Sequence, residues 1–384
     1  MNKKKVNYWL MWSQFQQFPL MFIVMNKTVI LPVNSKSMMT NKKLLFLFAA
    51  GAFMLLAHIP SLAQQQKAKV ATIAFYNLEN LFDTVNDTLI NDEEFLPEGV
   101  NKWTDERYQK KLANMSKVIS QIGEEYIKGG PTLIGVSEIE NRKVLEDLIN
   151  MPALANSGYG IVHYDSPDYR GVDVGLLYRK HDFTVINTVS ARLLMPGHEH
   201  WRSRDQLVVT GLLEGDTISV IVNHWPSRGN LPPFRAEAAR LTRSLADSLF
   251  RVSRNAKIVI MGDLNDDPVD ESVNVILGAE GREQKVKQKM LFNPMWKMYK
   301  EGIGSLAYRD SWNLFDQTIL SAPLLDKKSG SWYWLKTKVF NKPYLISQQG
   351  QYAGYPFRTY AGGAYEGGYS DHLPVYTVIV KEVH

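Results

Sequence analysis

Ile258-Val259-Ile260-Met261-Gly262-Asp263-Leu264-Asn265 begins with four apolar residues and ends with an acid and an amide. A short apolar run that stops at a glycine is typical of a buried β-strand followed by a turn. In an extended turn, Asp263 and Asn265 are two positions apart and point to the same side. One can orient a nucleophile while the other donates a hydrogen bond to a phosphoryl oxygen. An ordinary Asp-Asn turn cap fits the same letters, so this stretch alone does not choose between the two.

Other apolar runs in the chain end in the same way. Asn77, Glu138 and His224 each follow a β-prone apolar run, as Asp263 does. Sites in α/β folds gather at strand ends, because strand bodies are buried while their ends are exposed. A lone histidine is more often structural, but a carboxylate after a buried run needs a cation or strong donors nearby. We therefore expect these four side chains to share one edge of the fold.

Strands and helices alternate through the rest of the chain, with no long linker and no internal repeat. The pattern itself says only α/β or α+β, and the simplest interpretation is one domain over residues 64–384. Helices are predicted after Thr104 (apolar positions 108–122) and over 238–249, and strands over 70–76, 132–136, 172–178, 183–189, 207–213, 217–222, 258–261, 315–320 and 373–380.

The N-terminus has the features of a targeting segment. Asn41-Lys42-Lys43 is basic, residues 44–57 are apolar, and Ser61-Leu62-Ala63 is a small-x-small cleavage signature. This order predicts a signal peptide over residues 39–63, and hence a secreted or periplasmic protein without a transmembrane anchor in the mature chain. The apolar run is shorter than the roughly 20 residues that span a bilayer, although an uncleaved anchor is the alternative. Residues 1–38 are interpreted as an over-extended reading frame or a long leader.

The composition of the chain excludes several kinds of site. The chain has no cysteine, which excludes disulfides, zinc–thiolate sites and a cysteine nucleophile. Its net charge is +5, but residues 1–63 hold seven basic residues and no acidic ones. The predicted mature chain therefore carries 37 basic and 39 acidic residues, a net charge of −2. Any affinity for phosphate must be local, since the chain as a whole is not a basic nucleic-acid binder.

Seven short motifs in a fixed order resemble the endonuclease/exonuclease/phosphatase superfamily, which includes deoxyribonuclease I. The resemblance covers residues 71–380 and implies a four-layer α/β/β/α sandwich of two mixed sheets flanked by helices. The motifs are Tyr76-Asn77-Leu78-Glu79-Asn80, Ser137-Glu138-Ile139-Glu140, Asp173-Val174-Gly175-Leu176-Leu177-Tyr178-Arg179, Asn223-His224, Gly262-Asp263-Leu264-Asn265, Phe315-Asp316-Gln317 and Ser370-Asp371-His372-Leu373-Pro374-Val375.

The resemblance implies a metal site and a water-activating pair. Asn77, Glu138 and Asp371 match the metal-site residues. Oxygen-rich ligands favour Mg²⁺ or Mn²⁺, with Ca²⁺ as a third option. His372 matches the histidine that activates the attacking water, and Asp316 matches the carboxylate that orients it. Histidine can take a proton near neutral pH, and an acidic partner raises its basicity.

The resemblance also implies phosphate-binding residues. His224 matches a second histidine that assists the phosphate and leaving group, and Asp173 is the nearest candidate for its acidic partner. Asp263 and Asn265 match residues that orient the nucleophile and bind the scissile phosphate. Arg204 resembles a phosphate-contacting arginine, whereas Arg170 is a candidate from charge and placement only.

These features predict a secreted, divalent-metal-dependent hydrolase of phosphodiesters, first of all a nuclease acting on DNA or RNA. The alternatives are a phospholipid- or sphingomyelin-type or small-molecule phosphodiesterase or phosphatase, and a non-catalytic binding module on the same fold. Two further segments have substrate-binding interpretations. The basic run 282–289 is more simply a solvated face, and Trp332-Tyr333-Trp334 is more simply an edge strand with a packed face.

Overall fold

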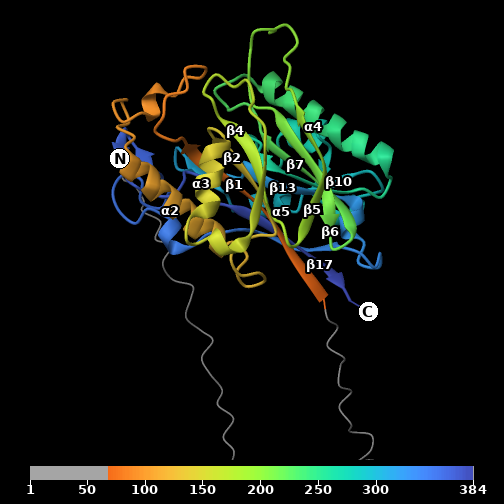
Figure 1. Cartoon of the computed structure of the whole chain (residues 1–384). Coiled ribbons are helices and arrows are strands. Elements are labelled where there is room, and N and C mark those ends of the chain that lie inside the picture. The colour runs from red at the N-terminus through yellow and green to blue at the C-terminus, as the bar shows by residue number, and fades with distance from the viewer. Residues whose placement is uncertain (1–67, 384) are drawn as a thin grey trace, which may run out of the picture. The chain divides into compact units, whose positions relative to one another are not determined.

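Two mixed β-sheets form the centre of the fold in the computed structural model, which describes residues 68–383 (Figure 1). The six-stranded sheet has the order β14 (Tyr333–Val339), β17 (Val375–Glu382), β1 (Ala68–Leu81), β2 (Leu133–Ile139), β4 (Asp173–Arg179) and β3 (Tyr159–His163). The seven-stranded sheet has the order β5 (Phe183–Ala191), β6 (Gln206–Leu213), β7 (Asp216–His224), β8 (Lys257–Asp263), β13 (Asp316–Ser321), β10 (Leu291–Phe292) and β9 (Ala279–Glu280).

Helices cover the outer faces of both sheets, so the molecule has four layers (Figure 1). Helices α2 (Asp105–Gln121) and α3 (Arg142–Asn150) pack on the six-stranded sheet, and α4 (Pro232–Val252) packs on the seven-stranded sheet. A third apolar cluster, with Phe75 from one sheet and Met261 from the other, fills the space between the sheets. The predicted α/β/β/α sandwich is confirmed. Among the described residues, the remaining α-helix is α5 (Met295–Lys300), and the remaining strands form the hairpins β11 (Leu306–Tyr308) with β12 (Ser311–Asn313) and β15 (Tyr360–Ala361) with β16 (Ala364–Tyr365).

Helix caps and turn residues in the sequence explain where predicted elements begin and end. Thr104 caps α2 by accepting a hydrogen bond from the Arg107 backbone N–H at 3.4 Å, as its position before the apolar periodicity predicts. Strands β6 and β7 form the predicted hairpin around Glu214-Gly215, with Gly215 at φ 82°. Glycine adopts this left-handed conformation without the steric penalty that a Cβ atom brings.

Strand register brings three predicted site residues into one row. Strands β7 and β8 are parallel and pair His224 with Asp263. Strands β8 and β13 are antiparallel and pair Asp263 with Asp316. Because directly paired residues in neighbouring strands lie side by side on one face, the ladder alone places these three side chains together.

Two segments with substrate-binding alternatives have the simpler structure. In the basic run, Arg282 pairs with Glu280, and Gln288 contacts Asn255. Asn255 lies just before the first residue of β8, whereas Asp263 is the last residue of that strand. The run therefore lies away from the strand ends that carry the predicted site. Trp332 is buried and donates to the Leu213 carbonyl at 3.1 Å, which confirms a packed edge for the aromatic triplet. Within residues 68–383, no helix has the length and apolar character needed to cross a membrane.

Candidate active site

The side chains of the candidate site meet around one carboxylate oxygen, Oδ2 of Asp263. His224 Nε2 lies 3.7 Å from it, His372 Nε2 lies 3.8 Å from it, and Asn77 Nδ2 donates to it at 3.2 Å. Glu138 joins the group through its Oε1 atom, 3.8 Å from His224 Nε2. All of these residues except Glu138 are buried, and the five come from β1, β2, β7, β8 and the segment just before β17. The structure thus brings together the four side chains that the sequence placed at strand ends.

His372 is held by a buried carboxylate. Its Nδ1 atom lies 2.7 Å from Asp316 Oδ2, and the Ser305 hydroxyl donates to the same oxygen at 2.6 Å. With Nδ1 donating its proton to Asp316, Nε2 is the free nitrogen and faces the site. Although burial opposes a charge on the imidazole, the nearby Asp316, Asp371 and Asp263 carboxylates raise the pKa of His372 well above its ordinary value. In its neutral form the imidazole is therefore a strong proton acceptor in this position.

Backbone strain is concentrated at the same strand ends. Glu138 has φ 56° and Asn265 has φ 51°, conformations that residues with a Cβ atom seldom adopt. At Asn265 the strained turn is held by two hydrogen bonds, from its backbone N–H to Asp263 Oδ1 at 2.9 Å and from its side chain to the Trp225 carbonyl at 3.0 Å. Strain that the surroundings maintain in this way is common at functional sites.

The donor set fits a hard divalent cation. Burial is the main cause that raises the pKa of Asp263 to about 7, and the neighbouring Asp316 and Glu138 carboxylates add to it. His372 compensates part of this charge, and carboxylates gathered in a buried place are further stabilised by a cation. Asn77 is placed differently from the simplest expectation. Its amide nitrogen donates to Glu138 and Asp263 at 3.2 Å each, while its oxygen accepts from the Glu79 backbone N–H at 2.9 Å, so it bridges the two carboxylates.

Asp371 lies next to a cationic network that the sequence analysis missed. Arg358 donates to Asp371 Oδ2 at 2.8 Å and to Glu79 Oε1 at 3.1 Å. Lys111, whose side chain is only 1% exposed, lies 3.6 Å from the other Glu79 oxygen and donates to Thr359 Oγ1 at 2.7 Å. A lysine on the apolar face of the helix predicted after Thr104 was the available signal for a buried partner.

His224 has the opposite electrostatic character to His372. Burial, with Arg204, Arg170 and His372 nearby, lowers its pKa well below the ordinary value, so the imidazole is neutral. Its Nδ1 atom is buried and has no hydrogen-bond partner among the described residues. Two histidines with opposite tendencies flanking one carboxylate can divide the tasks of accepting and donating a proton.

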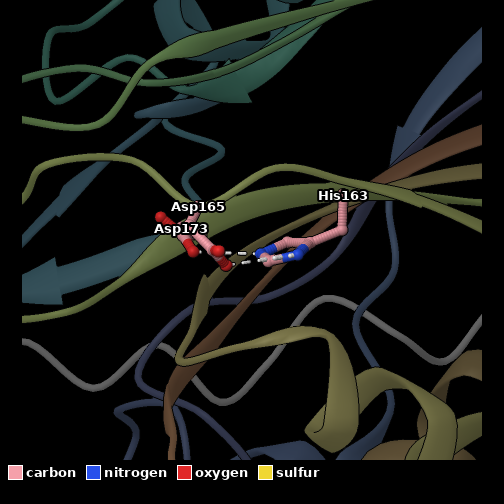
Figure 2. A group of neighbouring side chains, drawn as sticks. All are labelled: His163, Asp165 and Asp173. Atoms are coloured by element: carbon pink, nitrogen blue, oxygen red, sulfur yellow. Dashed lines mark hydrogen bonds and ion pairs between the residues drawn. The ribbon is translucent and has the colours of Figure 1, made fainter. Parts of the chain in front are cut away.

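The predicted pairing of Asp173 with His224 is wrong. Asp173 Oδ2 lies 3.0 Å from His163 Nε2, and its other oxygen accepts from the backbone and hydroxyl of Ser166. Figure 2 shows the Asp173 and Asp165 carboxylates at the same end of the His163 ring, within reach of its nitrogens. Because both oxygens of Asp173 are used in this way, the residue fixes the base of the loop 164–172 and does not orient His224.

That loop carries Arg170 to the site. Arg170 Nη2 donates to Asn80 Oδ1 at 2.6 Å and lies 3.7 Å from Glu138 Oε2, with about half of its side chain exposed. Arg204 is placed otherwise. It is buried, lies 3.1 Å from Asp168 Oδ2 and donates to the Trp225 carbonyl at 2.7 Å. Its ion pair with Asp168 ties two loops together beside His224, whereas Arg170 is open to a ligand.

Comparisons with known proteins identify the family and the fold of the chain. The sequence profile of the Endonuclease/Exonuclease/phosphatase family matches residues 72–381. No curated protein matches the chain in sequence. Among solved structures, an endonuclease/exonuclease/phosphatase family protein from Bacteroides thetaiotaomicron is similar, with a TM-score of 0.52 at 17% identity over 83% of this chain and 100% of that chain. A mannosyl-6-phosphatase from the same organism has a TM-score of 0.50 at 17% identity over 80% of this chain and 99% of that chain.

At this level of identity the solved structures establish the fold alone, whereas the profile spans nearly all the described residues. The chain belongs to the endonuclease/exonuclease/phosphatase family and is a metal-dependent hydrolase of phosphate esters.

Proposed function

We propose that the protein is a secreted Mg²⁺- or Mn²⁺-dependent nuclease that hydrolyses phosphodiester bonds of DNA or RNA. The observation that carries this proposal is the meeting of Asn77, His224 and His372 around Asp263 Oδ2, with the Glu138 carboxylate beside them. The arrangement combines a general base, a second neutral imidazole and oxygen ligands, which are the groups that phosphodiester hydrolysis needs.

Each residue has a part in the reaction. His372 Nε2 takes the proton of the attacking water, because Asp316 holds the other nitrogen and stabilises the imidazolium that forms. Asp263 lies between the two histidines and orients the nucleophile. Glu138 and Asp371 would hold the cation, and Asn77 keeps the Glu138 and Asp263 carboxylates at a fixed separation. A divalent cation at these residues would supply positive charge to the phosphoryl and leaving oxygens.

His224 and Asn265 act on the phosphate. The neutral His224 imidazole donates a hydrogen bond to a phosphoryl or leaving oxygen, as its depressed pKa favours. The Asn265 side chain lies close to His224, because it donates to the carbonyl of Trp225, the next residue after His224 in the chain. Neutral donors are suited to this role because they bind the anion without competing for the proton of the attacking water.

Local positive charge supports a polyanionic substrate, although the predicted mature chain is slightly acidic. Arg170, Arg228 and Arg358 come from three separate segments, and each side chain is between 40% and 52% exposed. Arg228 donates to the Asn265 carbonyl at 3.1 Å, and the other two contact the carboxylates of the cation site. Arginine side chains at the edge of a site are suited to the phosphates that flank a scissile bond.

Secretion rests on the sequence of residues 39–63, which lie outside the described part of the chain, as do residues 1–38. We propose that cleavage after Ala63 leaves a mature protein of residues 64–384, one catalytic domain that acts in the periplasm or outside the cell. Mass spectrometry of the N-terminus of protein recovered from the periplasm and the medium tests this. A start at Gln64 supports the proposal, and an intact N-terminus on cell-associated protein contradicts it.

A substrate panel tests the activity. Purified protein with Mg²⁺, Mn²⁺ or Ca²⁺ is assayed on plasmid DNA, RNA, sphingomyelin and bis-p-nitrophenyl phosphate. We expect cleavage of nucleic acid and of bis-p-nitrophenyl phosphate, and loss of both in His372→Ala. Cleavage of sphingomyelin alone, or only of a small phosphomonoester added to the panel, replaces the nuclease with one of the other phosphoesterases.

The control is another histidine. His181 is 94% exposed and lies in the turn between β4 and β5. His181→Ala has the same change in composition and is expected to keep full activity. If wild type, His181→Ala and His372→Ala are equal on every substrate, the catalytic role of His372 is wrong.

A further inference from the structure

The hairpin β11–β12 is attached to the active site by His372 itself. Leu306 of β11 forms an antiparallel bridge with His372, and the Leu373 backbone N–H donates to the Ser305 carbonyl at 2.7 Å. The Ser305 hydroxyl in turn donates to Asp316, which holds the His372 ring. The hairpin is thus positioned by the same residues that position the proposed base.

Register decides which hairpin side chains face the site. Residues that pair across an antiparallel bridge have side chains on the same face, so Leu306 shares the face of the His372 imidazole. Side chains alternate along a strand, so Tyr308 lies on that face as well, about 7 Å further along the hairpin. Trp312 pairs with Ala307 and therefore lies on the opposite face.

Strand β12 supports the same assignment of the face that looks toward the site. Asn313 pairs with Leu306 and lies on the face of Tyr308. Its side-chain oxygen is 3.5 Å from Arg228, which also donates to the carbonyl of Asn265. This face of the hairpin consequently looks toward the phosphate-binding side of the site.

Tyr308 is a large aromatic residue with an unusually high solvent exposure. Its side chain is 60% exposed, and it packs against one cation, the Arg309 guanidinium, at 5.1 Å from the ring centre. The turn that follows places Arg309 at φ 48° and Asp310 at φ 61°, where glycine or asparagine is the usual choice. Strain of this kind persists where the surroundings hold it, and it is concentrated at sites of binding or catalysis.

A brace holds the strained turn. The Asp310 backbone N–H donates to the Tyr355 hydroxyl at 2.7 Å, and that hydroxyl donates to Asp310 Oδ1 at 2.8 Å. Tyr355 lies in the segment that leads to Arg358, the arginine on the Asp371 carboxylate. The aromatic ring is therefore presented on a fixed support beside the cation site.

We propose that Tyr308 is a stacking platform for the nucleobase next to the scissile phosphate. The proposal rests on the proposed nuclease function and assigns a residue that selects the substrate without touching the reacting atoms. Every nucleobase has a π face, so stacking on tyrosine binds a single strand with little dependence on sequence. Arg309, above the same ring, is placed to contact a flanking phosphate.

The chemistry of the turn separates this partner from a membrane. A hairpin that enters a lipid surface carries apolar side chains at its tip. Here the tip is Arg309-Asp310, and Asp310 is already bonded to Tyr355. An exposed aromatic ring behind a charged tip suits a polyanion with aromatic bases better than a bilayer.

A binding experiment with two oligonucleotides tests the platform. The parent protein is the full chain carrying His372→Ala, which prevents turnover. Fluorescence anisotropy with Mg²⁺ measures its binding to fluorescein-labelled hexathymidylate and to the same hexamer with abasic residues at the central positions. Tyr308→Ala is expected to weaken binding of the base-bearing hexamer by about 5- to 100-fold and to leave binding of the abasic hexamer within about twofold, as the loss of a base-specific contact predicts.

Matched variants make the result specific. Tyr308→Phe keeps the ring and is expected to bind like the parent. Trp312→Ala removes a partly exposed aromatic ring from the opposite face and is also expected to bind like the parent. Circular dichroism and the melting temperature check that each variant is folded.

Several outcomes overturn the proposal: Tyr308→Ala binds like the parent, it weakens both oligonucleotides equally, or Trp312→Ala weakens binding as much. A parent that binds neither oligonucleotide overturns it too. Phosphodiester hydrolysis itself is judged separately, from bis-p-nitrophenyl phosphate and the wild-type enzyme. Co-sedimentation with sphingomyelin vesicles that depends on Tyr308 instead assigns the hairpin to a membrane.

Discussion

His372 and Asp316 form a buried pair, with 2.7 Å between Nδ1 and Oδ2, although 56 positions separate them in the chain. The Asp316 strand places the carboxylate in the row of His224 and Asp263, and the His372 loop reaches that row from the other sheet. The proposed base and the carboxylate that holds it are therefore positioned by different sheets, and the reaction depends on how the sheets pack.

Asp316→Asn is expected to lower kcat by about 10²- to 10⁴-fold. The Asp316 carboxylate raises the pKa of His372, so removing its charge lowers that pKa and weakens the base. The acid limb of the pH–rate profile should then move to lower pH. Ser305→Ala removes the hydroxyl that shares the same oxygen but leaves the charge in place, so its acid limb should stay near the wild-type position. An unshifted limb in Asp316→Asn would mean that another group controls it.

Glu138→Gln is expected to raise the Mg²⁺ concentration for half-maximal activity by about 10- to 100-fold. A neutral amide is a poorer ligand for a hard cation than a carboxylate, while the strained backbone at φ 56° is kept. The measurement is a Mg²⁺ titration of bis-p-nitrophenyl phosphate hydrolysis. Glu140→Gln makes the same chemical change two positions away and should leave the Mg²⁺ requirement as it is. Equal requirements in wild type and Glu138→Gln would remove Glu138 from the cation site.

Glu140 should make stability fall as pH rises. Burial raises its pKa from the ordinary 4.5 to about 8, against the hydrogen bond that it accepts from the Asp83 backbone N–H. Its favourable contribution is complete below pH 4.5, where both states are protonated, and is lost as pH rises through 8. Compared with Glu140→Gln, which does not ionise, the wild type should lose melting temperature steadily between those two pH values.

Glu125→Gln supplies the opposite sign for this test. Hydrogen bonds and charge from Tyr376 and Lys338 oppose the effect of burial and lower the pKa of Glu125. Its contribution is present above its ordinary pKa and is lost as pH falls. The two variants should therefore diverge from wild type in opposite pH directions. Parallel melting curves for wild type and Glu140→Gln at all pH values would show that Glu140 ionises freely in the folded state.

Lys111→Met is expected to destabilise the fold by about 3–5 kcal/mol, because it removes one partner of a buried ion pair and leaves Glu79 less compensated. Urea unfolding measures the change. Lys110→Met, on the exposed face of the same helix, should stay within about 0.5 kcal/mol of wild type. The double variant Lys111→Met with Glu79→Gln should lose less than the sum of the two single changes. Strict additivity would contradict a pair interaction.

Most of the layer architecture follows from local sequence signals. Buried strands such as β8 are long apolar runs, and helix α2 has both a cap and an apolar stripe, so they are predictable from neighbouring residues. Helix α3 and strand β3 are not among the predicted elements. They are nine and five residues long, and such short elements are stabilised mainly by packing that a short window does not contain.

The site residues also divide into those that local sequence signals predict and those that they do not. Polar residues at strand ends were predictable, because strand ends meet at one edge of a sheet whatever the loops do. The partner of Asp173 was not predictable. Nothing in the sequence indicates that Asp173 pairs with His163, ten positions away, and not with His224. Arg358 and Lys111 act through Glu79, which is 279 positions from one and 32 from the other, and only the folded chain shows the connection.

The row of His224, Asp263 and Asp316 across three strands also bears on how such a protein diversifies. Main-chain ladders of the large sheet fix that row, whereas Tyr308 projects from the separate hairpin β11–β12 and Arg170 and Arg358 project from connecting segments. Insertions and deletions in those segments can exchange one ligand preference for another while the hydrolytic apparatus is inherited unchanged. A laboratory redesign of selectivity can follow the same division and replace loops while the strands that carry the site are left unchanged.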